Sequence, residues 1–236
     1  MKLSISIVCP IYNEELNIYK LCQKINTYLL NKIEFDLIFV DDNSNDNSKK
    51  EIENCKKKFK YPIVMLSNKR KLGISACIDK AIKYSLKHII ITIDGDLQNN
   101  PKDIHSLLDF YIKNNLNYNL GIVIGQRLNR KDRLVKKITS KIGYFVRKLF
   151  FNDKIIDVAC GLRLIVKSAY LEIPYFDNMH RYYSVLFKRH GFIVMGVEIS
   201  HFKRKYGKSK FGVFNRLLPG IFDIFGVLWL MNRKRK

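Results

Sequence analysis

The sequence has few cysteines and no long uninterrupted hydrophobic run. Its five cysteines are scattered, and no two of them have the CxxC spacing. This pattern argues against a disulfide framework or a zinc site and favours a reducing compartment. The N-terminus runs directly into a strand-like segment and lacks the apolar core and cleavage site of a signal peptide. We therefore expect a cytoplasmic protein, or one that lies peripherally on the cytoplasmic face of a membrane.

Acidic residues are also scarce, with 21 Asp and Glu against 43 Lys and Arg, a net charge of +22. Such a field attracts nucleic acid, an anionic bilayer or phosphorylated substrates. An AT-rich genome that favours Lys and Asn would produce the same excess, so charge alone does not select the partner. The sequence has no zinc finger, RNP-like aromatic motif or basic zipper. A non-catalytic protein that binds polyanions or lipid is thus the weaker alternative, and we expect no nucleic-acid partner.

The first half alternates short apolar runs with amphipathic segments, which predicts an α/β fold with a mostly parallel central sheet flanked by helices. The predicted strands are Ser4–Cys9, Asp36–Val40, Ile63–Leu66, Ile89–Ile93 and Leu120–Ile124. The predicted helices are Glu14–Leu30, Ser48–Lys58, Ile74–Leu86 and Pro101–Lys113. In such sheets ligands bind at the carboxyl ends of the strands, and polar clusters follow the first, second and fourth strands.

The second half has a looser pattern. It predicts a basic helix at Leu134–Phe151, a helix near His180–His190 and a strand at Phe192–Ile199. The tail Phe211–Met231 has apolar residues at helical spacing on one face. The chain shows no interdomain linker, and 236 residues suffice for one substantial core.

The tail indicates how the protein meets a membrane. A spanning helix needs about 20 predominantly apolar residues, whereas two charged residues and a proline interrupt this one. Trp229 and the basic end Arg233–Lys236 are typical of a helix that lies in the interface of an anionic membrane. The alternative is a helix that packs on the domain and ends in a solvated basic tail. We expect the interfacial helix.

Asp94 and Asp96 follow an apolar strand, with Gly95 allowing a sharp turn between them. Two carboxylates so placed converge on one hard cation, and Gln98 can add a carbonyl oxygen. The bound cation would stabilise a departing diphosphate. A DxD phosphatase is the competing interpretation, but Leu97 and the mid-chain position disfavour it.

The surrounding motifs make this interpretation more specific. Together they resemble glycosyltransferase family 2, and within it the polyprenyl-phosphate group that includes dolichyl-phosphate mannose synthase-like enzymes. The segments that carry the resemblance are Cys9-Pro-Ile-Tyr-Asn-Glu14, Val40-Asp-Asp-Asn-Ser44, Asp94-Gly-Asp-Leu-Gln98, Gly125-Gln-Arg127, Gly161-Leu-Arg163 and Arg204-Lys-Tyr-Gly-Lys-Ser-Lys210. They occur in the family's order and span nearly the whole chain.

The resemblance implies a GT-A (nucleotide-diphospho-sugar transferase) fold. The catalytic domain would comprise 1–210, with a donor half at about 1–126 and an acceptor half at about 127–210. An amphipathic interfacial helix and basic tail would follow at 211–236. Lipid-phosphate enzymes of the family often carry two or more spanning helices after this domain, and 211–236 contains none, which puts integral attachment in doubt.

The resemblance also implies roles for individual residues. Pro10, Tyr12 and Glu14 would line the base and ribose, and Asp41 or Asp42 would accept the ring N–H that uracil and guanine both present. The alternative for Asp41–Ser44 is a turn and helix cap. The metal ligands for Mg²⁺ or Mn²⁺ would be Asp94, Asp96 and Gln98. The residues expected to act in catalysis are Asp94, Asp96, Arg127, Arg163 and Arg204, and those expected at the acceptor phosphate are Arg127, Lys141, Arg204, Ser209 and Lys210.

Three residues have open roles. His180-Arg181 resembles a pair in bacterial members of the family, although His180 could instead be a packing histidine. Asp157 lies where relatives also carry an acid. It would serve as a base for a hydroxyl acceptor, or it would orient Arg127 or Arg163, and we favour the orienting role.

We therefore expect a metal-dependent, inverting hexosyltransferase that moves a sugar from a GDP- or UDP-sugar to a polyprenyl phosphate of the undecaprenyl or dolichyl type. A phosphate monoester is already largely ionised near pH 7, so no dedicated base is needed. The alternative is a family 2 transferase that acts on a glycan hydroxyl in surface polysaccharide or lipopolysaccharide synthesis. The sequence does not select the sugar, the nucleotide, the lipid length or the oligomeric state.

Overall fold

The structure is a computed structural model that describes residues 3–115, 119–127, 144–204 and 214–233 (backbone only at 115 and 214–222). The predicted acceptor-site residues Lys141, Ser209 and Lys210 lie outside these ranges, as do residues 234–236 of the basic tail.

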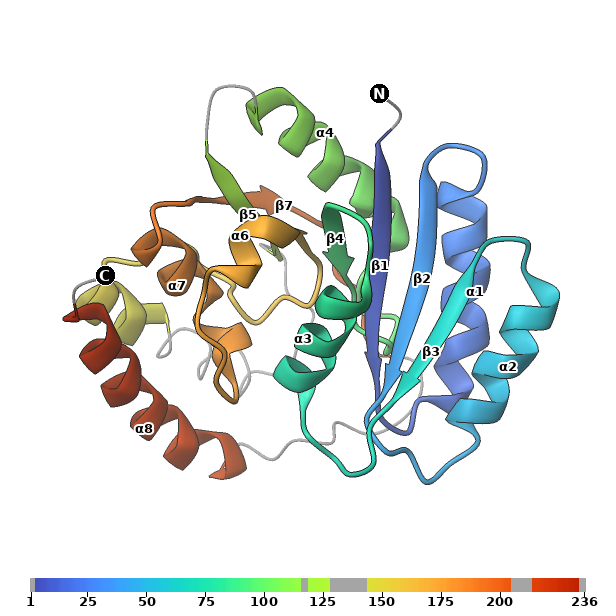
Figure 1. The fold of residues 1–236 in the computed structure, drawn as a ribbon, viewed down its shortest axis with the longest axis horizontal. Coiled ribbons are helices and arrows are strands. Elements are labelled where there is room, and N and C mark those ends of the chain that lie inside the picture. The colour runs from blue at the N-terminus through green and yellow to red at the C-terminus, as the bar shows by residue number, and fades with distance from the viewer. Residues whose placement is uncertain (1–2, 116–118, 128–143, 205–213, 234–236) are drawn as a thin grey trace.

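Within the described residues, one mixed sheet of seven strands forms the centre of the protein (Figure 1), in the order β3-β2-β1-β4-β6-β5-β7. The strands are β1 Ser4–Ile11, β2 Glu34–Asp41, β3 Ile63–Ser67, β4 Ile89–Thr92, β5 Leu120–Gln126, β6 Arg163–Val166 and β7 Ile193–Glu198. All strands predicted in the first half are present, as is the predicted strand near the end of the second half. The mostly parallel α/β sheet is thereby confirmed.

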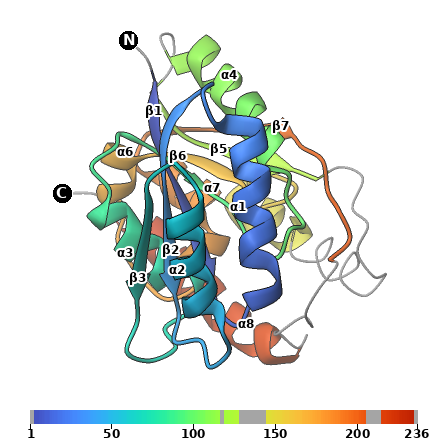
Figure 2. The same cartoon turned by 90° about the vertical axis from the view of Figure 1, so that its right-hand side faces the viewer.

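Helices cover both faces of the sheet. They are α1 Glu15–Leu29, α2 Ser48–Lys58, α3 Ile74–Tyr84, η1 Pro101–Asp103, α4 Ile104–Asn115, α6 Lys167–Leu171, η2 Met179–Arg181, α7 Tyr183–Arg189 and α8 Phe214–Met231. Residues 144–151 are also helical. Figure 2 shows α3 on one side of the sheet and α1 and α4 on the other. The helix predicted near His180–His190 is divided, since a short 3₁₀ turn precedes α7.

The central strands are apolar because both of their faces are covered. Residues of β1, β4 and β5 such as Ile7, Ile91 and Val123 are fully buried, and parallel strands that are enclosed in this way have continuous rather than alternating hydrophobic sequences. The buried residues of strands and helices form one continuous core cluster. This core holds the strand ends, and therefore the loops that follow them, in fixed positions.

The strand β6 was not predicted, and it changes the topology. It pairs antiparallel with both of its neighbours, β4 and β5, so that Arg163 lies opposite Thr92 on one side and Ile124 on the other. Because it runs in the opposite direction, its first residues lie where β4 and β5 end. The motif Gly161–Arg163 is thereby inserted between the ends of two strands that run the other way.

The C-terminal helix α8 is amphipathic over its described side chains. Val227 is 1% exposed and Ile224 and Leu230 pack on the core, whereas Phe225 and Trp229 are 66% and 60% exposed. Arg189 of α7 donates hydrogen bonds to the carbonyl oxygens of Leu230 and Arg233, at 3.0 Å each. Within the described ranges no helix combines the length and hydrophobicity needed to cross a bilayer.

Candidate functional site

The carboxyl ends of β1, β2 and β4 meet at one edge of the sheet. The register places Ile11 beside Asp41, and the backbone N–H of Ile93 donates to the carbonyl of Val8. The loops that leave these ends therefore lie together. The carboxylates of Glu14, Asp41, Asp42, Asp94 and Asp96 lie at or next to these strand ends.

The turn after β4 places two of these carboxylates at the centre of the edge. Gly95 packs closely, because a Cβ there would lie 2.6 Å from Ile11 Cδ1. Leu97 has a φ of 63°, a left-handed conformation that is uncommon for a leucine. The Gln98 backbone N–H donates to Asp96 Oδ1 at 3.1 Å, which closes the turn. Close packing and the strained residue together fix the directions of both carboxylates.

The Asp94 carboxylate lies against Gly161, since a Cβ at position 161 would overlap the carboxyl group. Burial raises the pKa of Asp94 to about 6, and the charge of Asp96 adds to the rise. The charges of Arg127, Arg163 and Arg204 act in the opposite direction. Three arginines from separate segments therefore approach one half-buried aspartate.

Arg127 follows β5 and is held by a buried ion pair. Its Nε donates to Asp157 Oδ2 at 2.6 Å and its Nη2 donates to Asp157 Oδ1 at 3.0 Å. Burial lowers the pKa of Arg127, but the hydrogen bonds and charge of Asp157 outweigh burial and raise it above its ordinary value. The backbone N–H of Asp157 in turn donates to Gln126 Oε1 at 3.0 Å. The predicted pairing of Asp157 with an arginine is confirmed, and the partner is Arg127.

Arg163, the first residue of β6, is 2% exposed. Its guanidinium lies 5.3 Å from the ring centroid of Tyr183, and its Nη2 donates to the Val158 carbonyl at 2.9 Å. Its Nε has no hydrogen-bond partner within the described structure. A buried guanidinium N–H without a partner is uncommon in folded proteins.

Arg204 contacts two carboxylates at the carboxyl edge of the sheet, those of Asp96 and Glu14. Its Nη2 donates to Asp96 Oδ2 at 2.8 Å and lies 3.4 Å from Glu14 Oε1. Burial lowers the pKa of Arg204, but the hydrogen bond and charge of Asp96 and the charge of Glu14 raise it overall. Glu14 also accepts a hydrogen bond from Asn17 Nδ2 at 2.6 Å. The motif that ends at Glu14 and the motif that begins at Arg204 thus meet at the ion pair of these two residues.

The Gln98 side chain is turned toward the segment before Arg204. Its Nε2 lies 3.3 Å from His201 Nε2 and donates to the Phe202 carbonyl at 3.3 Å. His201 is 6% exposed and was not identified from the sequence. A lone histidine after the last strand carried no spacing signal, and only the close approach of Gln98 reveals it.

The aspartates after β2 hold loops in place. Asp41 accepts from the Ser44 backbone N–H, which confirms the predicted turn. The two oxygens of Asp42 accept from the backbone N–H groups of Leu72 and Gly73, each at 2.8 Å. The sequence interpretation did not anticipate this role of Asp42, in which its carboxylate positions the loop that leads into α3.

Two further predicted residues lie near the same edge. Lys71 Nζ lies 3.7 Å from the centroid of the Tyr12 ring, over the face expected to stack on a base. His180 Nδ1 lies 2.7 Å from Ser75 Oγ, at the first turn of α3.

Across the described residues, no group of three or more His, Cys, Asp or Glu side chains has a metal-binding arrangement. Any cation bound by Asp94 and Asp96 therefore needs ligands of other kinds.

Comparison with known proteins agrees with this arrangement. The profile described as Glycosyl transferase family 2 matches residues 6–173. The chain is 27% identical to the dodecaprenyl-phosphate galacturonate synthase of Rhizobium johnstonii, over 99% of this chain and 69% of that protein. It is 26% identical to the undecaprenyl-phosphate 4-deoxy-4-formamido-L-arabinose transferase of Proteus mirabilis, over 95% of this chain and 67% of that protein. The chain thus spans about two thirds of each relative.

The fold is similar to that of glucosyl-3-phosphoglycerate synthase from Mycobacterium tuberculosis. The crystal structure of that enzyme with Mn²⁺, UDP and phosphoglyceric acid superposes with a TM-score of 0.73, over 99% of this chain and 80% of that chain. At 12% identity the likeness concerns the fold alone. It confirms the predicted GT-A fold.

We predict that Asp94→Asn stabilises the protein. A carboxyl whose pKa is raised by folding weakens the fold progressively as pH rises from about 4 to about 6, and this penalty is fully present at pH 7. An amide removes it, so thermal melting at pH 7.5 should rise by about 2–5 °C, with the gain shrinking toward pH 4. An unchanged or lowered melting temperature at pH 7.5 would contradict the electrostatic account of Asp94.

We predict that Gly161→Ala displaces the Asp94 carboxylate. The added methyl group overlaps that group, and overpacking of this kind costs about 1–3 kcal/mol of stability. Urea denaturation measures the loss. If Asp94 is the obstacle, the double variant Gly161→Ala/Asp94→Ala should recover most of the stability, whereas independent effects would simply add.

Proposed function

Because this chain belongs to glycosyl transferase family 2, we propose that it transfers a sugar from a nucleotide-sugar to a polyprenyl phosphate at a membrane surface. The observation that carries the proposal is the acidic edge of Glu14, Asp94 and Asp96, with Arg127, Arg163 and Arg204 around it. Two of its relatives are polyprenyl-phosphate sugar transferases. An acidic pair for a cation–diphosphate beside arginines for a second phosphate suits that reaction.

A divalent cation fits the residues at the edge. Asp94 and Asp96 offer hard carboxylate oxygens, and Gln98, on the same turn, has a side-chain carbonyl oxygen that can join them. Mg²⁺ and Mn²⁺ accept such ligands and leave positions for phosphate oxygens and water. The fold neighbour from M. tuberculosis has been crystallised with either ion and UDP. When bound, the ion would stabilise charge on the departing diphosphate.

The acceptor is better explained as a phosphate than as a hydroxyl. A hydroxyl acceptor needs a general base, and the carboxylate that would serve is Asp157, which is engaged on both oxygens by Arg127. A phosphate monoester is already ionised near neutral pH and needs only positioning and charge stabilisation. Arg163 Nε, buried and without a described partner, suits a phosphate oxygen nearby. These groups support direct displacement with inversion. The glycan-hydroxyl reaction remains the second candidate.

The nucleotide site is proposed at the ends of β1 and β2. Pro10, Tyr12 and Glu14 would line the base and ribose, and Asp41 or Asp42 would accept the N–H of the base. The Tyr12 face is covered by Lys71, so stacking on a base would require this lysine to move aside, where its charge could act on the diphosphate. The donor is a UDP- or GDP-sugar.

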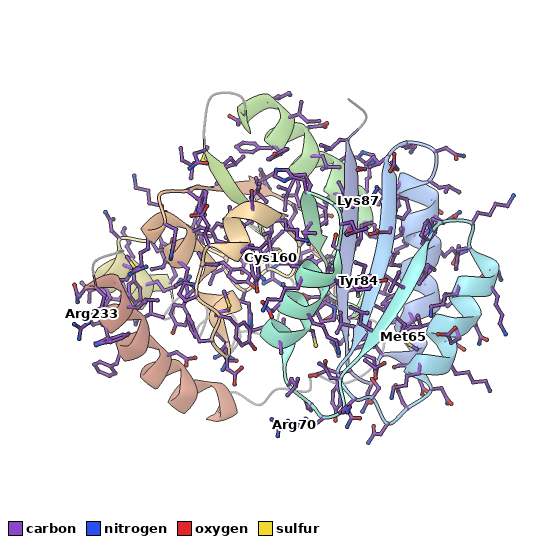
Figure 3. All side chains as sticks on the ribbon, viewed as in Figure 1. Met65, Arg70, Tyr84, Lys87, Cys160 and Arg233 are labelled. Carbon is purple, nitrogen blue, oxygen red and sulfur yellow. The ribbon has the colours of Figure 1, made fainter. Side chains whose placement is uncertain are left out.

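Exposed aromatic and aliphatic side chains support peripheral contact with a bilayer. Phe225 and Trp229 of α8 are 66% and 60% exposed, and in the helix of residues 144–151 Phe145 and Leu149 are 66% and 67% exposed. Both helices lie at the end of the molecule away from α1 and α2 (Figure 1). Figure 3 shows Arg233 at this end, and its guanidinium lies 4.9 Å from the centroid of the Trp229 ring. Apolar anchors beside basic groups suit an anionic interface.

The transfer reaction can be tested directly. Purified protein with Mn²⁺, a panel of UDP- and GDP-sugars and undecaprenyl phosphate should yield a radiolabelled product that extracts into organic solvent, and EDTA should abolish it. Asp94→Ala and Asp96→Ala should each lower the rate by about 10²-fold or more, because each removes a ligand of the cation that would stabilise the charge of the leaving group.

Asp109→Ala, which removes an exposed carboxylate on α4, is the matched control and should keep the wild-type rate. Product formed only on soluble glycans would favour the second candidate function. Undiminished transfer by folded Asp94→Ala and Asp96→Ala variants would exclude the proposed site.

Membrane contact predicts that the double variant Phe225→Glu/Trp229→Glu binds phosphatidylglycerol vesicles about tenfold or more weakly in a sedimentation assay. It replaces two apolar side chains that would enter the bilayer with charges that an anionic surface repels. Tyr84→Glu, at a 53% exposed tyrosine of α3, carries the same kind of change elsewhere and should bind as the wild type does. Equal binding of both variants would remove α8 from the membrane contact.

A further inference from the structure

Residues 200–204 form a strap that is hydrogen-bonded to η1 and to the turn after β4. At one end, Ser200 donates to Asp103 Oδ2 from its backbone N–H at 3.0 Å and from its hydroxyl at 2.5 Å. In the middle, the Phe202 N–H donates to the Gln98 carbonyl at 3.0 Å, and Gln98 Nε2 returns a bond to the Phe202 carbonyl at 3.3 Å. The strap is thus bound to the same turn that carries Asp94 and Asp96.

At its other end the strap places one positive charge on the carboxylates. Arg204 Nη2 lies 2.8 Å from Asp96 Oδ2 and 3.4 Å from Glu14 Oε1. The remaining Asp96 oxygen accepts the Gln98 N–H at 3.1 Å. A divalent cation that binds Asp96 must therefore share an oxygen with a donor that is already there. A divalent cation and a guanidinium on one carboxylate repel each other strongly when partly buried, so the cation and Arg204 compete for Asp96.

We propose that Arg204 is an internal stand-in for the divalent cation, which holds Glu14 and Asp96 until the metal–nucleotide complex displaces it. The inference rests on the proposed function for the identity of the ligands, and on the contacts of Arg204 with Asp96 and Glu14 for the competition. Once displaced, the guanidinium remains tethered beside the site through the strap, where it is available to an anionic acceptor. The same residue would then enforce binding of the donor before the acceptor.

This arrangement explains why an arginine fits this position. A guanidinium spreads its charge over several N–H groups and can bridge two carboxylates. The strap residues Ser200 and Phe202 keep it within reach in either position, so its release requires only local movement. Glu14 Oε1 would lose its contact with Arg204 in the same step, which opens this oxygen to the ribose hydroxyls at the moment the donor arrives.

The test measures cation binding apart from turnover. The protein is titrated with Mn²⁺ in a calorimeter in the presence of UDP or GDP. Mn²⁺ should bind Arg204→Ala about three- to tenfold more tightly than the wild type, because the ion pair of Arg204 with Asp96 no longer competes. Transfer to undecaprenyl phosphate should meanwhile fall by about 10²-fold, since the acceptor loses its arginine. Arg204→Lys, which keeps a charge but not the fork, should lie between the two in both measurements.

Lys203→Ala is the control for charge alone, because it removes an exposed neighbouring cation and should change Mn²⁺ affinity by less than about twofold in physiological salt. Circular dichroism and thermal melting establish that each variant is folded. Asp103→Asn gives an independent check, since it weakens the strap's attachment without touching the carboxylates, and it should raise Mn²⁺ affinity while transfer continues.

Unchanged or weaker Mn²⁺ binding by folded Arg204→Ala, or the same gain in Lys203→Ala, overturns the inference. The proposed function fails separately, when the wild type transfers no sugar to any lipid phosphate. Tighter Mn²⁺ binding by Arg204→Ala would then still establish the competition at Asp96.

Discussion

Negative charge gathered at the carboxyl edge of the sheet requires compensation, and three arginines from distant segments supply it. Glu14, Asp94 and Asp96 arrive from two loops of the first half, and burial already raises the pKa of Asp94 to about 6. Carboxylates this close and this buried repel one another unless cations are placed among them. The cations are Arg127, Arg163 and Arg204, all from the second half of the chain. The two halves are therefore one electrostatic unit rather than independent lobes.

Each arginine is held in a different way, and the difference bears on chemistry. Arg127 is fixed by a buried bidentate pair with Asp157, and breaking such a pair costs about 3–5 kcal/mol, so it is a permanent part of the site. Arg163 is enclosed beside Tyr183 with one N–H unpaired among the described residues. Arg204 is half-buried, lies at the end of a strap, and contacts Glu14 and Asp96, the carboxylates that a cation would need. A fixed arginine such as Arg127 can orient a substrate, whereas a displaceable one such as Arg204 can exchange a carboxylate for another anion.

Several features of the site followed from local patterns. Apolar runs and their turn residues predicted the strands β1, β2 and β4, and the rule that ligands bind at strand ends placed Asp94 and Asp96 at the edge. Other features required contacts between distant segments. Asp42 holds the loop at Leu72 and Gly73, and Gln98 faces His201. A local sequence pattern cannot predict which carboxylate will accept hydrogen bonds from a loop 30 residues away. Every loop carries backbone N–H groups, so the sequence does not distinguish one donor from another.

The amino-acid order by itself determined the class of fold, the acidic turn after β4 and the set of arginines to expect, because hydrophobic periodicity and short motifs are local properties. Only the tertiary structure decided how these groups combine. The antiparallel strand β6 is four residues long and fully buried, too short for a periodic signal, yet its direction brings Gly161 against Asp94. The ion pair of Arg204 with Glu14 joins residues 190 positions apart. Such contacts depend on the packing of the whole sheet, which fixes where each strand end lies, and no segment of the sequence contains that information alone.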